Sequence, residues 1–211
     1  SDPEHGGEQV QQQGEGHGGP SENAIGTFWQ ENVLPVVRPA ISRQTSVCAT
    51  ETGTEMQSQA WPRTAVVGSG GGGCYFGGML ARAGAPVTLI GRPKHVEAFK
   101  RGGLRMDTTR FQASVPISAS TDIAAVKGAQ LVLFSVKSID SEPVARSLAP
   151  YLARDALILD LQNGVDNVPR ICRQLPNAVV AAVVYVACEM VGAGCVKHHG
   201  RGDLVIGALD V

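Results

Sequence analysis

Beyond residue 62, the chain alternates short apolar runs with amphipathic stretches. Its first run, 63–68 (RTAVVG), ends in glycine and is typical of a buried parallel strand. A helical spacing of apolar residues follows over 73–83 and stops at Gly84, a residue type favoured after a helix C-terminus. Similar patterns predict strands at 86–90, 131–136, 156–161 and 179–184, and helices at 142–153 and 165–174. This alternation predicts an α/β fold of the Rossmann type, an open and mostly parallel sheet with helices on both faces.

Two further segments have weaker strand patterns. Residues 104–115 have the pattern of a β-hairpin. The tail contains two short candidate strands, 195–199 and 203–206, separated by a glycine-rich turn at 200–202. Both segments therefore predict pairs of antiparallel strands.

The first 62 residues have a different composition. Residues 1–24 are mainly Gly, Gln, Glu, His and Ser, so they lack the apolar surface that could offset the entropy of ordering. Residues 1–62 hold two basic and eight acidic side chains, whereas residues 63–211 hold 16 basic and 11 acidic ones. We therefore expect a low-complexity, disordered leader, 1–62, in front of one mildly basic domain, 63–211. A linker, a tag remnant, a mis-called upstream reading frame and a regulatory arm are all compatible with such a leader.

Composition excludes several classes of protein and site. The longest nearly uninterrupted apolar run, 178–188, has 11 residues, whereas a membrane-spanning helix needs about 20. No secretory signal pattern opens the sequence, and no cluster of Lys and Arg indicates a nucleic-acid surface. The five cysteines are widely spaced without a zinc-binding pattern, so we expect free thiols and no metal. These features indicate a cytoplasmic protein without a membrane or nucleic-acid partner.

A glycine-rich turn between the first strand and the first helix is the strongest chemical signal. It comprises Gly68, Ser69, Gly70, Gly71, Gly72 and Gly73, which fit the G-x-G-x-x-G pattern of dinucleotide-binding proteins. Gly68 permits the tight turn, Gly70 lets the backbone approach a pyrophosphate, and Gly73 lets the helix pack closely on the strand. The helix N-terminus then faces the phosphates. Glycine at both x-x positions is unusual and is expected to soften the start of the helix.

The residue after the second strand indicates which dinucleotide is bound. NAD-binding sites place an Asp or Glu there to bind the ribose 2′-hydroxyl. This chain has Gly91 and Arg92 instead, and a guanidinium can bind a 2′-phosphate through two hydrogen bonds. Lys94 and His95 could add to the same pocket. The sequence therefore favours NADP(H) over NAD(H), the alternative being a solvated surface arginine.

Four segments, in this order and spacing, resemble a known family. They are GSGGGGCYFGGMLARAG at 68–84, VTLIGR at 87–92, LVLFSVKS at 131–138 and LQNGV at 161–165. Together they resemble ketopantoate reductase (2-dehydropantoate 2-reductase), an NADPH-dependent family that makes pantoate for vitamin B5 and coenzyme A. The resemblance covers about residues 63–211. It implies that the glycine turn holds the pyrophosphate and that Arg92 holds the 2′-phosphate.

The same resemblance assigns three further residues. Lys137 matches a cofactor-side lysine, Asn163 matches an asparagine that reaches the nicotinamide ribose and the substrate, and Ala187 matches a position whose backbone lies by the nicotinamide. Lys137 and Asn163 also follow the ends of predicted strands, where ligands bind in such sheets. An exposed loop charge at Lys137 and a simple turn at Asn163 remain the alternatives.

The resemblance also implies what this chain lacks. The family has a second, mostly helical domain with the lysine that acts as general acid, and the sequence stops at Val211, where that domain would begin. His198 and His199 do not match that acid, so no catalytic residue is assigned within the chain. We expect the chain to supply the cofactor-binding half of a reductase of a small 2-keto acid, ketopantoate, and to bind NADPH without turnover.

Other functions and states remain open at this point. They are a non-catalytic NADP-binding or redox-sensing module, a reductase of another 2-keto acid, and a truncated gene product. An exposed apolar face would also favour a homo-oligomer.

Overall fold

The computed structural model describes residues 61–207, which contain one nine-stranded sheet in the order β4-β3-β9-β8-β7-β6-β1-β2-β5. The strands are β1 (Thr64–Val67), β2 (Val87–Ile90), β3 (Leu104–Asp107), β4 (Gln112–Val115), β5 (Ser118–Ser120), β6 (Leu131–Phe134), β7 (Leu157–Asp160), β8 (Val179–Gly192) and β9 (Cys195–Ile206). The helices are α3 (Gly71–Arg82), α4 (Pro93–Gly102), α5 (Ser141–Leu148) and α6 (Asn167–Cys172), with 3-10 turns η2 (Ile123–Val126) and η3 (Ser138–Asp140). The predicted disorder of residues 1–62 falls almost entirely outside the described residues.

Six parallel strands form the Rossmann part of the sheet. Their spatial order is β5-β2-β1-β6-β7-β8, and β1 pairs in parallel with both β2 and β6. The chain runs outward from β1 through β2 to β5 and then returns to the other side of β1 as β6. Because the crossovers on the two sides of this reversal diverge, ligands bind beyond the carboxyl ends of the strands there. The predicted fold class is confirmed.

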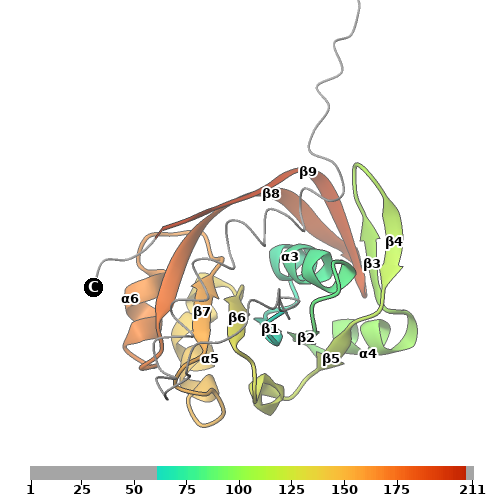
Figure 1. Cartoon of the computed structure of the whole chain (residues 1–211). Helices are drawn as coiled ribbons and strands as arrows, with labels where there is room; N and C mark the ends of the chain where they lie inside the picture. Colours follow the sequence, from blue (N-terminus) through green and yellow to red (C-terminus); the bar gives the residue numbers. More distant parts are fainter. Residues whose placement is uncertain (1–60, 208–211) are drawn as a thin grey trace, which may run out of the picture.

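The remaining strands curl the sheet back over helix α3. Strand β8 is 14 residues long and pairs antiparallel with β9, which pairs in parallel with β3 of the β3–β4 hairpin. Figure 1 shows β8 and β9 arching over α3, with α5 and α6 near β7 on the other side. Helix α3 therefore lies inside an apolar cluster formed by both parts of the sheet.

A second apolar cluster covers the opposite face of the parallel strands. It contains side chains of α5, α6 and η2, packed on residues such as Val132, Phe134 and Ile158 that are buried completely. The parallel strands are thus covered on both faces, which explains why they consist of apolar runs without alternation. None of the helices within residues 61–207 has the length and apolar content to span a membrane.

The expectation of two short strands in the tail is wrong. Residues 195–206 form the single strand β9, and the glycine-rich stretch is a bulged region rather than a turn. The register with β8 shifts between Tyr185 and Val186, next to Gly202 (φ 136°) and Arg201 (φ 61°). Glycine permits this local conformation without ending the strand, because it readily adopts the positive φ found at this bulge.

The helices and strands differ from the prediction mainly at their ends. Helix α3 begins at Gly71, two residues earlier than expected, while α5 ends at Leu148, because Pro150 has no N–H to continue the helical hydrogen bonds. Helix α4 was not predicted, since only Val96 and Phe99 of its ten residues are buried. The β-hairpin within 104–115 is confirmed as β3 and β4.

Candidate functional site

The glycine-rich turn begins at the end of β1, wedged between the ends of β2 and β6. Gly68 has a φ of 111°, and its N–H donates to Ile90 O at 3.0 Å. A Cβ on Gly68 would lie 2.7 Å from the backbone carbonyl of Ser135. The Ser135 hydroxyl donates to Gly68 O at 2.9 Å. The turn is therefore fixed at the reversal of the strand order.

The other glycines of the turn divide into packed and open positions. A Cβ on Gly73 would overlap both Gly68 O and Ser135 Oγ, whereas no atom lies within 4 Å of a Cβ built on Gly70 or Gly72. The first hydrogen bond of α3 runs from Cys74 N to Gly70 O at 2.9 Å. The N–H groups of the preceding helical residues lack acceptors within the helix and can donate to an anion.

Gly71 is explained by packing against β8. A Cβ on Gly71 would lie 2.9 Å from Cys188 O, so β8 passes directly over the start of α3. Ala187 precedes Cys188 in β8, is exposed and pairs with Gly200 of β9. The structure thus brings the backbone at Ala187 to the N-terminal end of α3, and the unusual glycine at 71 is required by this close approach.

Ser69 of the turn lies against Gly91 at the end of β2, and Arg92 follows directly in the chain. Ser69 is buried, and a Cβ on Gly91 would overlap its hydroxyl, so glycine at 91 leaves room for this side chain. Arg92 is the exposed N-cap residue of α4, and its side chain has no hydrogen bond or ion pair within residues 61–207. Its guanidinium is free to bind a phosphate beside the turn.

The neighbours of Arg92 face different surroundings. Lys94 is exposed, whereas His95 is half-buried and its Nδ1 accepts a long hydrogen bond, 3.5 Å, from Gly194 N in the β8–β9 turn. Burial, with smaller effects of Arg92 and Lys94, lowers the pKa of His95. His95 therefore contacts the β8–β9 turn as a neutral acceptor and adds little charge to the predicted pocket.

Lys137 and Asn163 lie in adjacent loops after β6 and β7. Ser138 Oγ donates to Asn163 O at 3.2 Å, and Asn167 Nδ2 donates to the same oxygen at 3.0 Å. Both Lys137 and Asn163 are exposed, and their side-chain polar groups have no partner within residues 61–207. The fold thus gathers the predicted lysine and asparagine at the same edge of the sheet as the glycine turn.

Buried polar residues beneath these loops were missed by the sequence analysis. Gln162 and Ser141 are buried and hydrogen-bonded to each other, and Asp160 at the end of β7 is 3% exposed. Gln162 N donates to Asp160 Oδ1 at 3.1 Å. The available signal was three polar or acidic residues, Asp160, Gln162 and Asn163, within four positions at the end of an otherwise apolar strand.

Replacing Asp160 by asparagine is expected to raise the free energy of unfolding near neutral pH by about 2 kcal/mol. Burial raises the pKa of the Asp160 carboxyl from 3.8 to about 6, opposed by the hydrogen bond from Gln162 N–H. The folded protein binds the carboxyl proton of Asp160 more tightly than the unfolded chain does. The free energy of unfolding of the wild type therefore falls as the pH rises from 3.8 to about 6.

Asparagine keeps an oxygen for the Gln162 N–H but cannot ionise. The increase in the free energy of unfolding caused by Asp160→Asn should therefore disappear below about pH 4, where the wild-type carboxyl is protonated in both the folded and the unfolded state. Urea denaturation followed by circular dichroism, at about pH 4 and about pH 7.5, measures the difference. An equal gain at both pH values would contradict this origin.

The cysteines and acidic residues of the described part do not assemble a metal site. No group of three or more His, Cys, Asp or Glu side chains within residues 61–207 is arranged to hold an ion. Burial, and to a lesser extent the nearby Cys188 thiol, raises the pKa of Cys74 to about 12, and burial raises that of Cys188 to about 11. Both thiols are therefore protonated at neutral pH and act as small apolar side chains.

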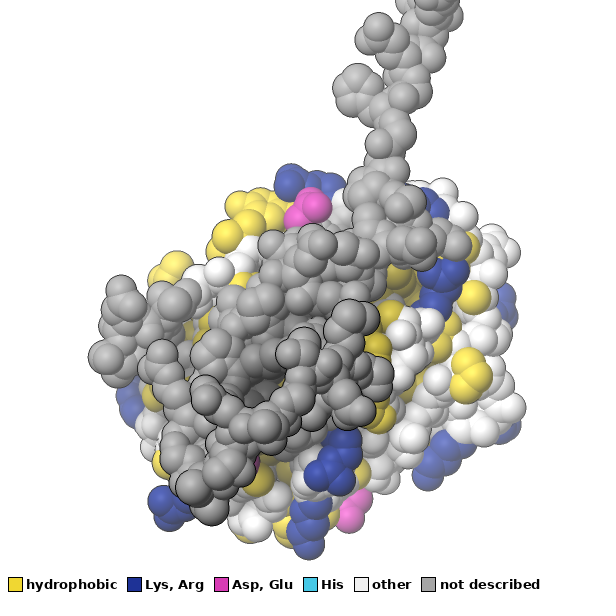
Figure 2. Space-filling view, viewed as in Figure 1, with side chains coloured by type: hydrophobic (Ala, Val, Ile, Leu, Met, Phe, Trp, Pro, Cys, Tyr) yellow, Lys and Arg dark blue, Asp and Glu magenta, His cyan; other side chains and the backbone are white. Residues whose placement is uncertain are grey.

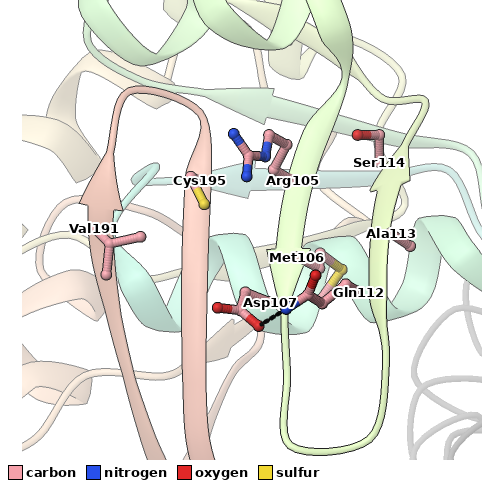
Figure 3. A pocket seen from close by; sticks show the side chains of 8 residues that line it. All are labelled: Arg105, Met106, Asp107, Gln112, Ala113, Ser114, Val191 and Cys195. Atoms are coloured by element: carbon pink, nitrogen blue, oxygen red, sulfur yellow. Dashed lines mark hydrogen bonds between the residues drawn. The ribbon is translucent and has the colours of Figure 1, made fainter.

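A depression of about 390 Å³ lies away from these residues, on the β3–β4 hairpin and the β8–β9 turn. Figure 3 shows Arg105 and Asp107 on β3 beside Gln112 on β4, whose Nε2 donates to Asp107 Oδ1 at 3.0 Å. None of the predicted site residues lines it. On the face shown in Figure 2, Lys and Arg side chains are spread over the surface, and few acidic side chains are visible.

Comparisons with known proteins point to one family. The family model described as Ketopantoate reductase PanE/ApbA matches residues 64–211. The 2-dehydropantoate 2-reductase of Halobacterium salinarum is 33% identical over 151 residues, and that of Pyrococcus horikoshii is 32% identical over 142 residues. These matches cover 69% and 67% of this chain but 48% and 46% of the two relatives.

A solved structure gives the same result. The PanE/ApbA family ketopantoate reductase from Ralstonia eutropha JMP134 superposes with a TM-score of 0.67 at 55% identity. The superposition covers 68% of this chain and 48% of that one. The chain therefore spans about half the length of the proteins it matches.

Proposed function

The chain belongs to the ketopantoate reductase family of oxidoreductases, and from this premise we propose that it binds NADPH for the reduction of 2-dehydropantoate to pantoate. Its relatives, which are 2-dehydropantoate 2-reductases, support 2-dehydropantoate, a small 2-keto acid, as the substrate. The product is the pantoate used for vitamin B5 and coenzyme A.

The glycine turn at the strand reversal is the observation that carries the proposal. Gly68 and Gly73 close the turn against Ser135, while the space beside Gly70 is open. An anion placed there meets the unpaired N–H groups and the positive end of the α3 dipole. The residues present thus fit a pyrophosphate, and Gly68 to Gly73 are proposed to hold it.

NADP(H) rather than NAD(H) is proposed because of the residues after β2. Gly91 provides no carboxylate for a ribose 2′-hydroxyl, and Arg92 provides an unpaired guanidinium. A 2′-phosphate would gain a charge-assisted hydrogen bond from Arg92. An acidic residue at position 91 would instead repel it.

The proposed cofactor supplies a hydride for the ketone. Lys137 is proposed to donate to ribose or carboxylate oxygens, and Asn163 to hold the ribose and the substrate by donating and accepting. The backbone at Ala187, in the part of β8 that passes over the start of α3, is proposed to border the nicotinamide. A developing alkoxide also needs a proton donor.

Neither histidine of β9 is placed to be that donor. The His198 ring stacks on Tyr75 with 4.4 Å between ring centroids, and its Nε2 contacts Arg201 O at 2.7 Å. His199 Nε2 contacts Glu189 Oε1 at 2.9 Å. We therefore propose that residues 61–207 bind and orient the cofactor, and that the proton comes from outside this part of the chain.

Isothermal titration of the 211-residue chain with NADPH tests the proposal. Saturable binding with a stoichiometry near one is expected, and so is the absence of ketopantoate-dependent NADPH oxidation in an absorbance assay. Absence of NADPH binding would refute the proposed function. Steady oxidation would support the substrate but contradict the expectation that the chain alone does not turn over.

A further inference from the structure

A buried amide lies directly beneath the two loops that carry Lys137 and Asn163. The side chain of Gln162 is 8% exposed, and its Nε2 donates to Val136 O at 2.7 Å and to Ser141 Oγ at 2.9 Å. The carbonyl of Val136 can only accept, so the nitrogen of the amide must face it. Gln162 thus ties the end of β7 to the chain immediately before Lys137.

The link continues through Ser141 to the other side of Lys137. Ser141 is completely buried at the start of α5, and its hydroxyl donates to Ser138 O at 2.9 Å. The carbonyls of Val136 and Ser138, one on each side of Lys137, are therefore held by one connected set of hydrogen bonds. A lysine that served only as a solvated loop charge would not require its neighbouring carbonyls to be held by buried hydrogen bonds.

The same connection reaches Asn163. Ser138 Oγ donates to Asn163 O, so the residue after Lys137 is bound to the residue after Gln162. Lys137 and Asn163 themselves leave their side chains exposed. The backbone of each is thus fixed while its polar head remains available.

We propose that Gln162 is a positioning residue, which fixes the Lys137 loop to the Asn163 loop so that both side chains meet one dinucleotide. The inference rests on the proposed function for the ligand, whereas the hydrogen bonds themselves do not depend on it. Removing the amide leaves Val136 O without a donor and lets Lys137 sample several orientations. Dinucleotide affinity then falls although no contacting group has been removed.

The test is a double-mutant cycle between Gln162→Met and Lys137→Ala in the 211-residue chain. Methionine has a similar length but no donor. In the wild-type background, Gln162→Met should weaken NADPH binding about 5–10-fold, as expected when a buried hydrogen bond that orders a loop is lost. In the Lys137→Ala background, the same change should weaken binding less than about twofold, because the residue that it positions is absent.

Asn177→Leu provides a matched control. Asn177 is also a buried amide, and its Nδ2 donates to Ala153 O and Ala156 O at the opposite, amino-terminal edge of β7. Its replacement should lower thermal stability at least as much as Gln162→Met while leaving the NADPH affinity of the folded protein unchanged. Equal affinity losses for Gln162→Met in both backgrounds would overturn the positioning role.

Hydrogen–deuterium exchange of the free protein separates this inference from the proposed function. Gln162→Met should speed amide exchange over 136–140 about tenfold and leave the β1–β2 region unchanged. Unchanged exchange over 136–140 would overturn the inference whether or not a dinucleotide binds. If Gln162→Met speeds exchange over 136–140 but neither the wild type nor Lys137→Ala binds NADPH, the proposed function fails, while the role of Gln162 in ordering the Lys137 loop is supported.

Discussion

Gly73→Ala is expected to abolish NADPH binding and to lower the free energy of unfolding by about 3 kcal/mol. The added methyl group would overlap Gly68 O and Ser135 Oγ, and one of these atoms belongs to backbone that is fixed between β2 and β6. Alanine gains about 1 kcal/mol of helix propensity over glycine, too little to offset this overlap. Helix α3 would have to move away from β1, which displaces its N–H groups from the phosphates.

Two neighbouring glycines provide controls for this change. At Gly72 no atom lies within 4 Å of a Cβ, so Gly72→Ala should keep NADPH binding and raise stability by up to about 1 kcal/mol. Gly70 is equally open and has an extended backbone (φ −81°), so Gly70→Ala should fold normally. Its affinity for NADPH should nevertheless fall at least about tenfold, because position 70 is where the backbone approaches the pyrophosphate and an added methyl group would obstruct that approach. Thermal melts and NADPH titrations of the three variants measure both effects. Equal behaviour of Gly73→Ala and Gly72→Ala would contradict the packing argument.

Arg92→Ala is expected to weaken NADPH binding about 100-fold and NADH binding less than about threefold. A guanidinium that binds a phosphate contributes about 1.5–3 kcal/mol, and each 1.4 kcal/mol corresponds to a factor of ten in affinity. NADH lacks the 2′-phosphate, so removing the Arg92 guanidinium removes no contact from it. Competitive titrations with both dinucleotides give the ratio directly.

Arg101→Ala controls for the general effect of positive charge. Arg101 is exposed in the last turn of the same helix, α4, while Arg92 caps its first turn. Removing the charge at the far end should change NADPH affinity less than about twofold, because solvent screens it. A wild-type chain that binds NADH more tightly than NADPH would overturn the NADP assignment, and equal losses for both arginine variants would assign the effect to net charge.

The sequence predicted the parallel part of the fold well because its strands are buried on both faces. Runs such as 131–134 contain only apolar residues, and the glycine turn fixes where the first helix starts. The curled part was harder to predict. From Val183 to Met190 exposed and half-buried side chains of β8 alternate although the residues stay apolar as far as Cys188, and bulges in β9 have the same residue composition as turns.

The candidate site shows the same division. Arg92, Lys137 and Asn163 could be found from their places after strands, since the ends of parallel strands share one edge. Gly71 could not be explained from sequence, because its neighbour Cys188 comes from a distant strand. Gln162 and Ser141 were missed because their hydrogen bonds join separate loops, and the polar residues around Gln162 do not by themselves reveal such a connection.

The passage of β8 over the start of α3 has a consequence for the order of folding during synthesis. A nascent chain that has exposed β1 to β7 outside the ribosome has its glycine turn but leaves one face of α3 bare. Only when β8 and β9 emerge do Cys188 and His198 cover that helix, at Gly71 and Tyr75. Such sequence-distant contacts form late and slowly. The glycine turn and α3, which are synthesised early, therefore reach their final environment only after β8 and β9 have been synthesised.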